Sequence, residues 1–224
     1  MSSEKNIMRT SLFLSIIIGC FFLLSCEKEK TDLFKKEYFY YTFNFEKIPL
    51  YLYLSEVYIQ FNHSLTKEET KKFIDKYTFI NNNQTSPRIN TENKNLKCII
   101  NAKDTIQLVS LLKVLNQDTI SYAVPVFTMI NNDPKTYCIP INEILCDPLI
   151  SEPELIKIIS KYNLTIIKSK PEHLYYKLKI NEIIAGFEPL KIANSLNETG
   201  NFNYCCPNII AAGGVIKGIL TKNN

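Results

Sequence analysis

Residues that could carry out covalent chemistry are sparse in this chain of 224 residues. Its two histidines, His63 and His173, do not stand in a His-Gly-Thr context, and no Gly-Thr-Ser surrounds a candidate serine. A Ser-His-Asp triad needs a nucleophile, a base, an orienting acid and oxyanion donors, and no segment marks these parts together. Gly213-Gly214 is not followed by the Lys-Ser/Thr of a phosphate-binding loop. We therefore expect a protein that is not an enzyme and binds no cofactor.

The cysteines are the other reactive side chains. Two of the seven, Cys20 and Cys26, belong to the N-terminal segment, and the remaining five are Cys98, Cys138, Cys146, Cys205 and Cys206. None of these five has a histidine at ligand spacing, so no metal site is expected. Five is an odd number, so at least one thiol is free or bonded to another molecule, and both buried reduced thiols and a disulfide stay open. Neighbours on a strand face opposite sides, so Cys205 and Cys206 cannot both meet one partner.

The N-terminal segment has the pattern of an export signal. Lys5 and Arg9 precede an apolar run of 14 residues, which is shorter than the roughly 20 residues that span a membrane. The run ends in Leu23-Leu24-Ser25-Cys26, which resembles the lipobox of bacterial lipoproteins. The resemblance implies that residues 1–25 are a signal peptide and that Cys26 carries membrane lipid. The protein would then be anchored in the cell envelope, at the outer membrane or cell surface.

Alternatives to this processing remain. Cleavage before Cys20 would leave Phe21-Phe22-Leu23-Leu24 on the mature chain, which disfavours that site. An uncleaved signal anchor or an ordinary secretory peptide is also compatible with the pattern. The formal net charge of the chain is +4, and charges of both signs are scattered without a long basic block. Nucleic acid is therefore not expected as a partner.

The remainder of the chain contains an internal repeat. A Tyr-x-x-Pro motif, a Lys-Tyr pair and a helix-start pattern each occur twice, 82 to 85 residues apart: Tyr122–Pro125 and Tyr204–Pro207, Lys76-Tyr77 and Lys161-Tyr162, Thr66–Glu69 and Ser151–Glu154. A solenoid unit would repeat after about 20–50 residues. The observed interval is the size of a small domain, so we expect two copies of one fold.

The hydrophobic periodicity predicts strand, helix, two strands, helix and strand in the second copy. In the first copy it predicts strand, helix, strand, helix and strand, and a further strand between Tyr77 and Asn95 would complete the same pattern. Thr66 with Glu69, and Asp104 with Gln107, have the spacing of helix N-terminal caps, while Pro189 opens the last helix and Gly200 marks its end. Two helices on one face of a four-stranded antiparallel sheet form the ferredoxin-like arrangement. The expected class is α+β, with two tandem ferredoxin-like (βαββαβ) units, and each Tyr-x-x-Pro proline is expected at a sheet edge or where pairing ends.

These patterns give the expected boundaries. An aromatic stretch from Tyr38 to Phe45 predicts a β-hairpin that turns through residues 44–47 into the first unit. The domains are residues 26–37 as a tether, 38–130 and 131–210 as the two α/β units, and 211–224 as a C-terminal tail.

Several segments together resemble a known family. They are Tyr40–Leu50, Val124–Phe127 followed by Ile141–Ile144, Lys161–Leu164, and Ile192–Leu196 through Tyr204 and Pro207. In order and spacing they are similar to the fervidolysin-type double N-terminal prodomain of subtilisin-like serine proteases, over residues 38–210. The chain departs from that pattern at Leu145-Cys146-Asp147-Pro148, where a basic strand is usual, and at Cys206, where an acidic residue is usual.

The resemblance implies a binding function. In such prodomains the open sheet face covers two helices of the protease, and the residues after the last strand lie in its cleft. Here those residues are Asn208, Ile209, Ile210, Ala211 and Ala212. The 14 residues after Ile210 are too few for a catalytic domain, so we expect a module that inhibits or helps fold a subtilisin-like protease in trans. The alternative is a structural or surface-interaction lipoprotein, or a remnant of a split protease gene.

Overall fold

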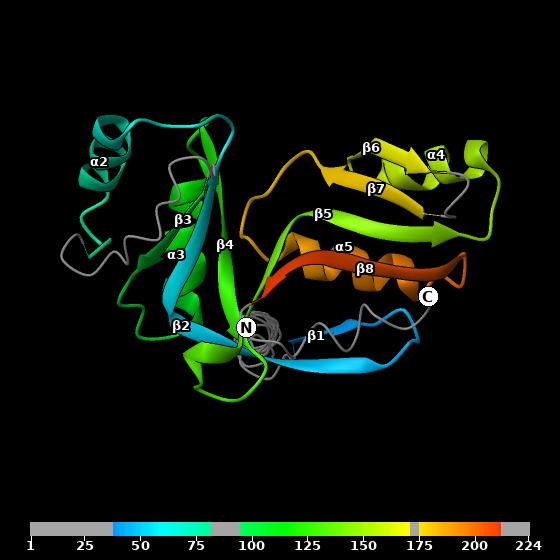
Figure 1. The fold of residues 1–224 in the computed structure, drawn as a ribbon, viewed down its shortest axis with the longest axis horizontal. Helices are drawn as coiled ribbons and strands as arrows, with labels where there is room; N and C mark the ends of the chain where they lie inside the picture. The colour runs from blue at the N-terminus through cyan, green and yellow to red at the C-terminus, as the bar shows by residue number, and fades with distance from the viewer. Residues whose placement is uncertain (1–37, 82–94, 171–174, 212–224) are drawn as a thin grey trace, which may run out of the picture. The chain divides into compact units, whose positions relative to one another are not determined.

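Figure 1 shows the computed structural model, which describes residues 38–81, 95–170 and 175–211. This part of the chain is α+β, as expected, and its eight strands form one antiparallel sheet. The elements are β1 (Tyr38–Tyr41), β2 (Lys47–Phe61), α2 (Lys67–Lys76), β3 (Asn95–Ile99), α3 (Thr105–Asn116), β4 (Ser121–Thr128), η1 (Pro134–Thr136), β5 (Tyr137–Pro148), α4 (Glu152–Lys161), β6 (Leu164–Lys170), β7 (Tyr175–Ile180), α5 (Glu188–Asn197) and β8 (Phe202–Ala211). In the described residues, no helix is long and apolar enough to cross a membrane.

The expected N-terminal hairpin is present. β1 pairs with the start of β2 from Tyr38–Leu50 to Tyr41–Lys47, and Phe45 adopts a positive φ of 59° in the turn between them. β2 continues from this hairpin into the first half as one strand of 15 residues. An irregularity between Tyr53 and Val57 lets β2 pass from its pairing with β1 to its pairing with β3 without ending.

The sheet has two halves, the first with strands β1 to β4 and the second with strands β5 to β8. Corresponding strands pair in the same order in both. In the first half β2 lies between β3 and β4, and Ile80 bridges Ile100 beyond β3. In the second half β5 lies between β7 and β8, and β6 pairs with the outer side of β7. In both halves the first strand therefore lies between the last strand and the strand that precedes the second helix.

The Tyr-x-x-Pro motif occupies the same register in each half. In β4, Tyr122 lies opposite Gln60 and Pro125 lies opposite Val57. In β8, Tyr204 lies opposite Asp147 and Pro207 opposite Ile144. Each proline faces the end of an irregularity in its partner strand, between Tyr53 and Val57 and between Pro140 and Ile144. Among the described strands, none pairs with the second side of either proline, which agrees with the expected position at an edge or where pairing ends.

The helix ends are repeated as well. Thr66 donates its N–H and hydroxyl to the Glu69 carboxylate at 2.8 and 2.9 Å, and Ser151 does the same to Glu154 at 3.1 and 2.7 Å. Both predicted N-terminal caps are thus confirmed, and Tyr77 and Tyr162 are the C-terminal cap residues of α2 and α4. Asp104 caps α3 by accepting from the Gln107 N–H at 2.8 Å.

An asparagine ends the second helix of each half and binds the backbone of the last strand. The Ala123 N–H donates to Asn116 Oδ1 at 2.6 Å, and the Cys205 N–H donates to Asn197 Oδ1 at 2.8 Å. In both halves the donor directly follows the tyrosine of the Tyr-x-x-Pro motif. A buried amide N–H without a partner is costly, so each asparagine stabilises the unpaired side of its strand.

The two halves share their apolar interior. The described residues belong to one compact unit with two hydrophobic clusters. Phe187 and Leu190, from α5 and its N-cap, belong to the cluster of the first half, whereas Val124 and Val126 of β4 belong to that of the second. Every residue of β4 is consequently buried. In a half-buried strand, buried and exposed residues alternate. β4 does not alternate in this way, because the second half of the sheet covers the face that α3 leaves open.

Gly186 lies close to the backbone of β4, where the two halves meet. Its φ is +82°, and a Cβ at this position would lie 2.9 Å from the Ala123 carbonyl oxygen and 3.1 Å from the Val124 Cα. Asn116 Nδ2 donates to the carbonyls of Ala123 at 2.9 Å and Ile184 at 3.3 Å. Only glycine adopts this φ without strain and allows this contact, so the loop before α5 rests directly on the backbone of β4.

Candidate protein-binding surface

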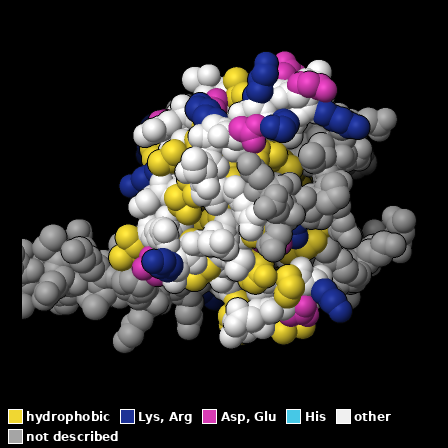
Figure 2. Space-filling model, turned by 90° about the vertical axis from the view of Figure 1, so that its left-hand side faces the viewer, with side chains coloured by type: hydrophobic (Ala, Val, Ile, Leu, Met, Phe, Trp, Pro, Cys, Tyr) yellow, Lys and Arg dark blue, Asp and Glu magenta, His cyan; other side chains and the backbone are white. Residues whose placement is uncertain are grey.

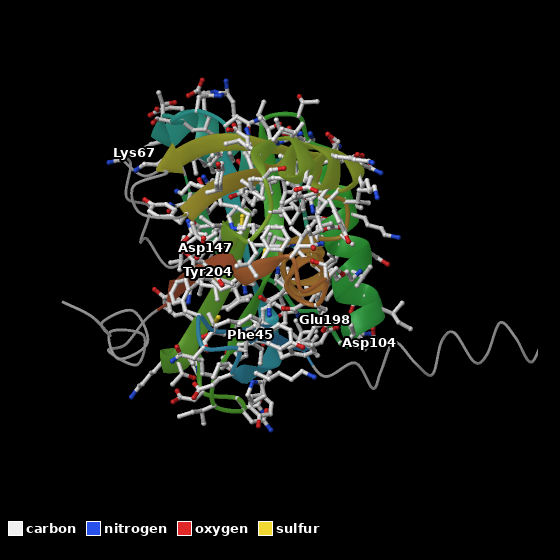
Figure 3. All side chains as sticks on the ribbon, turned by 90° about the vertical axis from the view of Figure 1, so that its right-hand side faces the viewer. Phe45, Lys67, Asp104, Asp147, Glu198 and Tyr204 are labelled. Carbon is white, nitrogen blue, oxygen red and sulfur yellow. The ribbon has the colours of Figure 1, made fainter. Side chains whose placement is uncertain are left out.

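In the part of the chain that the structure describes, one face of the second half carries no helix. Ile144 and Cys146 of β5, and Leu178 of β7, are fully buried in the cluster that contains Leu155 of α4 and Ala193 of α5. Successive strand residues point to opposite faces, so the residues between them form the other face. Figure 3 shows Asp147 and Tyr204 on that side and Glu198, which follows α5, on the opposite side. We call this the helix-free face; it comprises Glu143, Leu145, Asp147, Lys177, Lys179, Tyr204, Cys206 and Asn208.

A polar network across three strands occupies the centre of the helix-free face. Glu143 Oε2 of β5 forms an ion pair with Lys177 Nζ of β7 at 2.7 Å. The same oxygen accepts from Asn208 Nδ2 of β8 at 2.6 Å. The Lys177 and Glu143 side chains are 28% and 22% exposed, so the network is partly shielded but open to a partner. It ties β7 and β8 to the central strand.

The network is bordered by aromatic and amide groups. Asn203 Nδ2 donates to Asp147 Oδ2 at 2.8 Å, and the Tyr204 ring meets Phe43 edge to face with centroids 4.4 Å apart. Burial, with the charges of neighbouring groups, raises the pKa of the Tyr204 hydroxyl above its usual value. Tyr204 therefore stays a neutral hydrogen-bonding group, and Phe43 brings the N-terminal hairpin to the rim of this face.

The predicted cleft-contact residues lie at the end of β8. Ile209, Ile210 and Ala211 pair with Pro140, Ile139 and Cys138 of β5. Asn208 is directed onto the helix-free face by its bond to Glu143. These four residues are thus held in the sheet, and the strand extends past the expected end of the unit at residue 210. The fifth predicted residue, Ala212, lies outside the described residues.

Other predicted positions fall partly outside the described residues. Cys26, the signal peptide, the tether, His173 and the tail are among these, whereas His63 is exposed in the loop before α2. Within the described ranges no group of three or more His, Cys, Asp or Glu residues could hold a metal ion. The five cysteines there are buried and unbonded.

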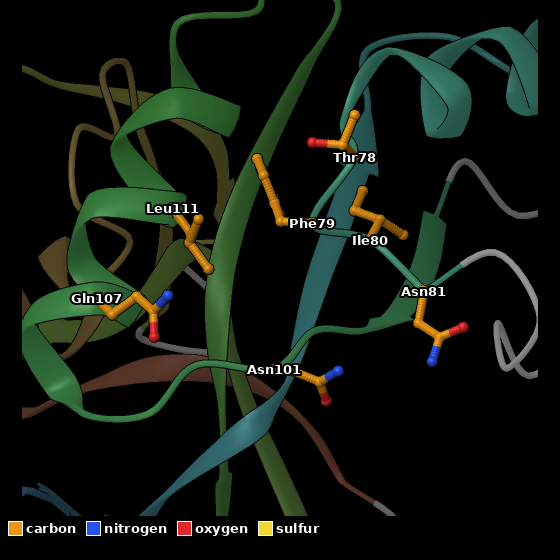
Figure 4. A pocket seen from close by; sticks show the side chains of 7 residues that line it. All are labelled: Thr78, Phe79, Ile80, Asn81, Asn101, Gln107 and Leu111. Carbon is orange, nitrogen blue, oxygen red and sulfur yellow. The ribbon is translucent and has the colours of Figure 1, made fainter.

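Two of the pockets among the described residues have a polar lining. One, of about 460 Å³, lies between Gln107 and Leu111 of α3 and the segment Thr78–Asn81 (Figure 4). The other, of about 430 Å³, lies between the halves and is lined by asparagines from both, Asn62, Asn116, Asn142 and Asn181. Asn62, Asn116 and Asn181 already use their amide groups in hydrogen bonds within the protein. Three of these four asparagines therefore support the fold itself.

On the side of the first half that Figure 2 shows, the described charged side chains do not form a patch of a single sign. Basic and acidic side chains are interspersed there, with apolar side chains between them.

The sequence analysis did not identify the Glu143–Lys177–Asn208 network. Its signal is the alternation of polar and apolar residues along β5 and β7, which separates the two faces of the sheet.

Comparisons with known proteins add no relative. A scan against protein-family models, a search of curated proteins and a search of solved structures each found no match.

Proposed function

We propose that this chain is a non-catalytic binding module, anchored to the bacterial envelope by lipid on Cys26, that presents its helix-free face to another protein. We propose further that its halves are two tandem ferredoxin-like units. The repeated strand order, β4–β2–β3 and β8–β5–β7–β6, and the repeated register of Tyr122 and Tyr204 support this assignment. The observation that carries the function is that, among the residues the structure describes, no helix covers the face formed by β5, β7 and β8.

A subtilisin-like protease is the proposed partner. The resemblance over residues 38–210 assigns the open sheet face to two protease helices, and the polar network offers ion-pairing and hydrogen-bonding groups to such a surface. The end of β8 near Ala211 would then contact the substrate cleft. Because Ile209 to Ala211 pair with β5, residues beyond them have to supply the cleft contact, or these pairs have to open on binding.

That pairing favours the second candidate function. A strand end held in the sheet is not free to lie in a protease cleft, which suits a surface-interaction lipoprotein with no retained protease contact. The helix-free face would then bind a different envelope protein. The two functions share this surface but differ in whether the partner's active site is blocked.

Inhibition measurements distinguish them. The purified protein is titrated at micromolar concentration against subtilisin-like proteases secreted by the same source, with hydrolysis of a chromogenic peptide as the readout. We expect inhibition that Lys179→Glu, on the helix-free face, weakens at least tenfold. Lys191→Glu, an exposed lysine on α5, makes the same charge change on the helix side and should leave inhibition unchanged. If none of these proteases is bound or slowed, the protease proposal is wrong; equal effects of both variants would exclude the helix-free face.

A further inference from the structure

Two of the buried cysteines lie directly opposite each other. Cys146 of β5 and Cys205 of β8 are register partners, and both are 0% exposed within the same hydrophobic cluster. Burial, together with the neighbouring Cys146 thiol, raises the pKa of the Cys205 thiol. The other three described cysteines face different residue types, since Cys98 pairs with Val57, Cys138 with Phe127 and Ala211, and Cys206 with Leu145.

The hydrogen bonding of Cys205 fixes the kind of strand pair. Its N–H donates to Asn197 Oδ1 at 2.8 Å, on the side away from β5. A residue whose N–H points away from the partner strand belongs to a non-hydrogen-bonded pair, with Cα atoms about 4.5 Å apart and the side chains close together. Disulfides span Cα distances of about 4.4–6.8 Å. The two sulfurs can therefore be joined without moving the strands.

The first half supplies an internal comparison. At the same two positions of the repeat it has Ile59 and Ala123, which are register partners and fully buried. Asn116 binds the Ala123 N–H as Asn197 binds that of Cys205. An apolar pair thus fills this site in one copy, so packing alone does not require two cysteines in the other.

We propose that Cys146 and Cys205 form an intramolecular disulfide between β5 and β8. The oxidant is a disulfide of the thiol-oxidising class found outside the cytoplasm, where disulfides persist. The thiolate of one cysteine attacks a donor sulfur and releases one donor thiol; the second thiolate attacks the mixed disulfide and releases the other. Two protein S–H bonds are lost, two electrons reduce the donor disulfide to two thiols, and one S–S bond forms. Because both sulfurs are buried, the exchange takes place before β8 closes onto β5.

Peptide mapping tests this pairing. The full protein is isolated from the cell envelope with iodoacetamide present throughout, unfolded in the same reagent, digested without reductant and examined by mass spectrometry. We expect one peptide pair that links Cys146 to Cys205 and separates on reduction, while Cys98, Cys138 and Cys206 are alkylated. Recovery of Cys146 and Cys205 as singly alkylated peptides, or linked to other cysteines, overturns the proposal.

A second measurement uses variants that keep the site packed. Dithiothreitol should lower the urea midpoint of the wild type, because the link closes a long loop that contains α4, β6, β7 and α5. Cys146→Val with Cys205→Ala approximates the pair of the first half and should have a midpoint that dithiothreitol does not change. Cys98→Ala is the matched control and should retain the effect of the reductant. A Cys98→Ala midpoint that is insensitive to dithiothreitol would contradict the assignment of the bond to Cys146 and Cys205.

Discussion

Replacing Gly186 by alanine tests how the two halves are joined. A residue other than glycine at the φ of +82° costs about 1–2 kcal/mol. The new Cβ would also lie 2.9 Å from the Ala123 oxygen, which is backbone and cannot rotate away. Forcing an extra carbon into a packed site costs about 1–3 kcal/mol. The free energy of unfolding should therefore fall by about 2–5 kcal/mol in total.

Gly200 provides the matched control. Its φ is +73°, but a Cβ there would meet nothing within 4 Å. Gly200→Ala should consequently lose only the conformational part, about 1–2 kcal/mol, and the change in the unfolded chain is common to both variants. Urea unfolding followed by far-UV circular dichroism measures both. If the two variants lose the same free energy within about 0.5 kcal/mol, the size of an ordinary surface effect, Gly186 does not lie against the backbone of β4.

Three further perturbations follow from the described contacts. Asn197→Ala leaves the buried Cys205 N–H without a partner and should cost about 1–3 kcal/mol in urea unfolding; a loss below 0.5 kcal/mol, within the range of surface substitutions, would refute this role. Burial opposes ionisation of the Asp118 carboxyl, but hydrogen bonds from Lys76 and Tyr77 lower its pKa below the ordinary value. The ionised carboxylate therefore adds to the free energy of unfolding in full above about pH 4, and this stabilisation is lost as the pH falls through the folded pKa. The stability difference between wild type and Asp118→Asn should therefore shrink from pH 6 to pH 3, and a constant difference would contradict it. Burial raises the pKa of the Cys98 thiol to about 12, so its alkylation at pH 8 should be on the order of a thousandfold slower in the folded than in the unfolded protein; equal rates by mass spectrometry would show that the site is open.

Local chemistry made the helix starts predictable. Thr66 with Glu69 and Ser151 with Glu154 satisfy their own helix N-termini, so the residues that carry the signal also form the contact. The hairpin of β1 and β2 was predicted from the aromatic stretch Tyr38 to Phe45 and the turn that follows it. The repeat was visible because Tyr122 and Tyr204 keep the spacing to their prolines.

Contacts between distant segments were not predictable in the same way. Asn116 and Asn197 perform one role, but they lie 7 and 8 residues before their donors, and an amide-to-backbone bond leaves no hydrophobic period. The pairing of Cys146 with Cys205 depends on the register of two strands separated by two helices. The burial of Val124 and Val126 on the second face had a weak signal in the continuous apolar run of β4, which an alternating interpretation of strands overlooks.

The burial of β4 on both sides sets the valency of the proposed module. Tyr58, Tyr122, Val124 and Val126 of the first half pack into the second hydrophobic cluster, so they are not presented to another protein. In the duplication that we propose, they lie on the face of the first half that corresponds to the helix-free face. The proposed duplication therefore leaves one binding face rather than two, and we expect one partner molecule for each chain.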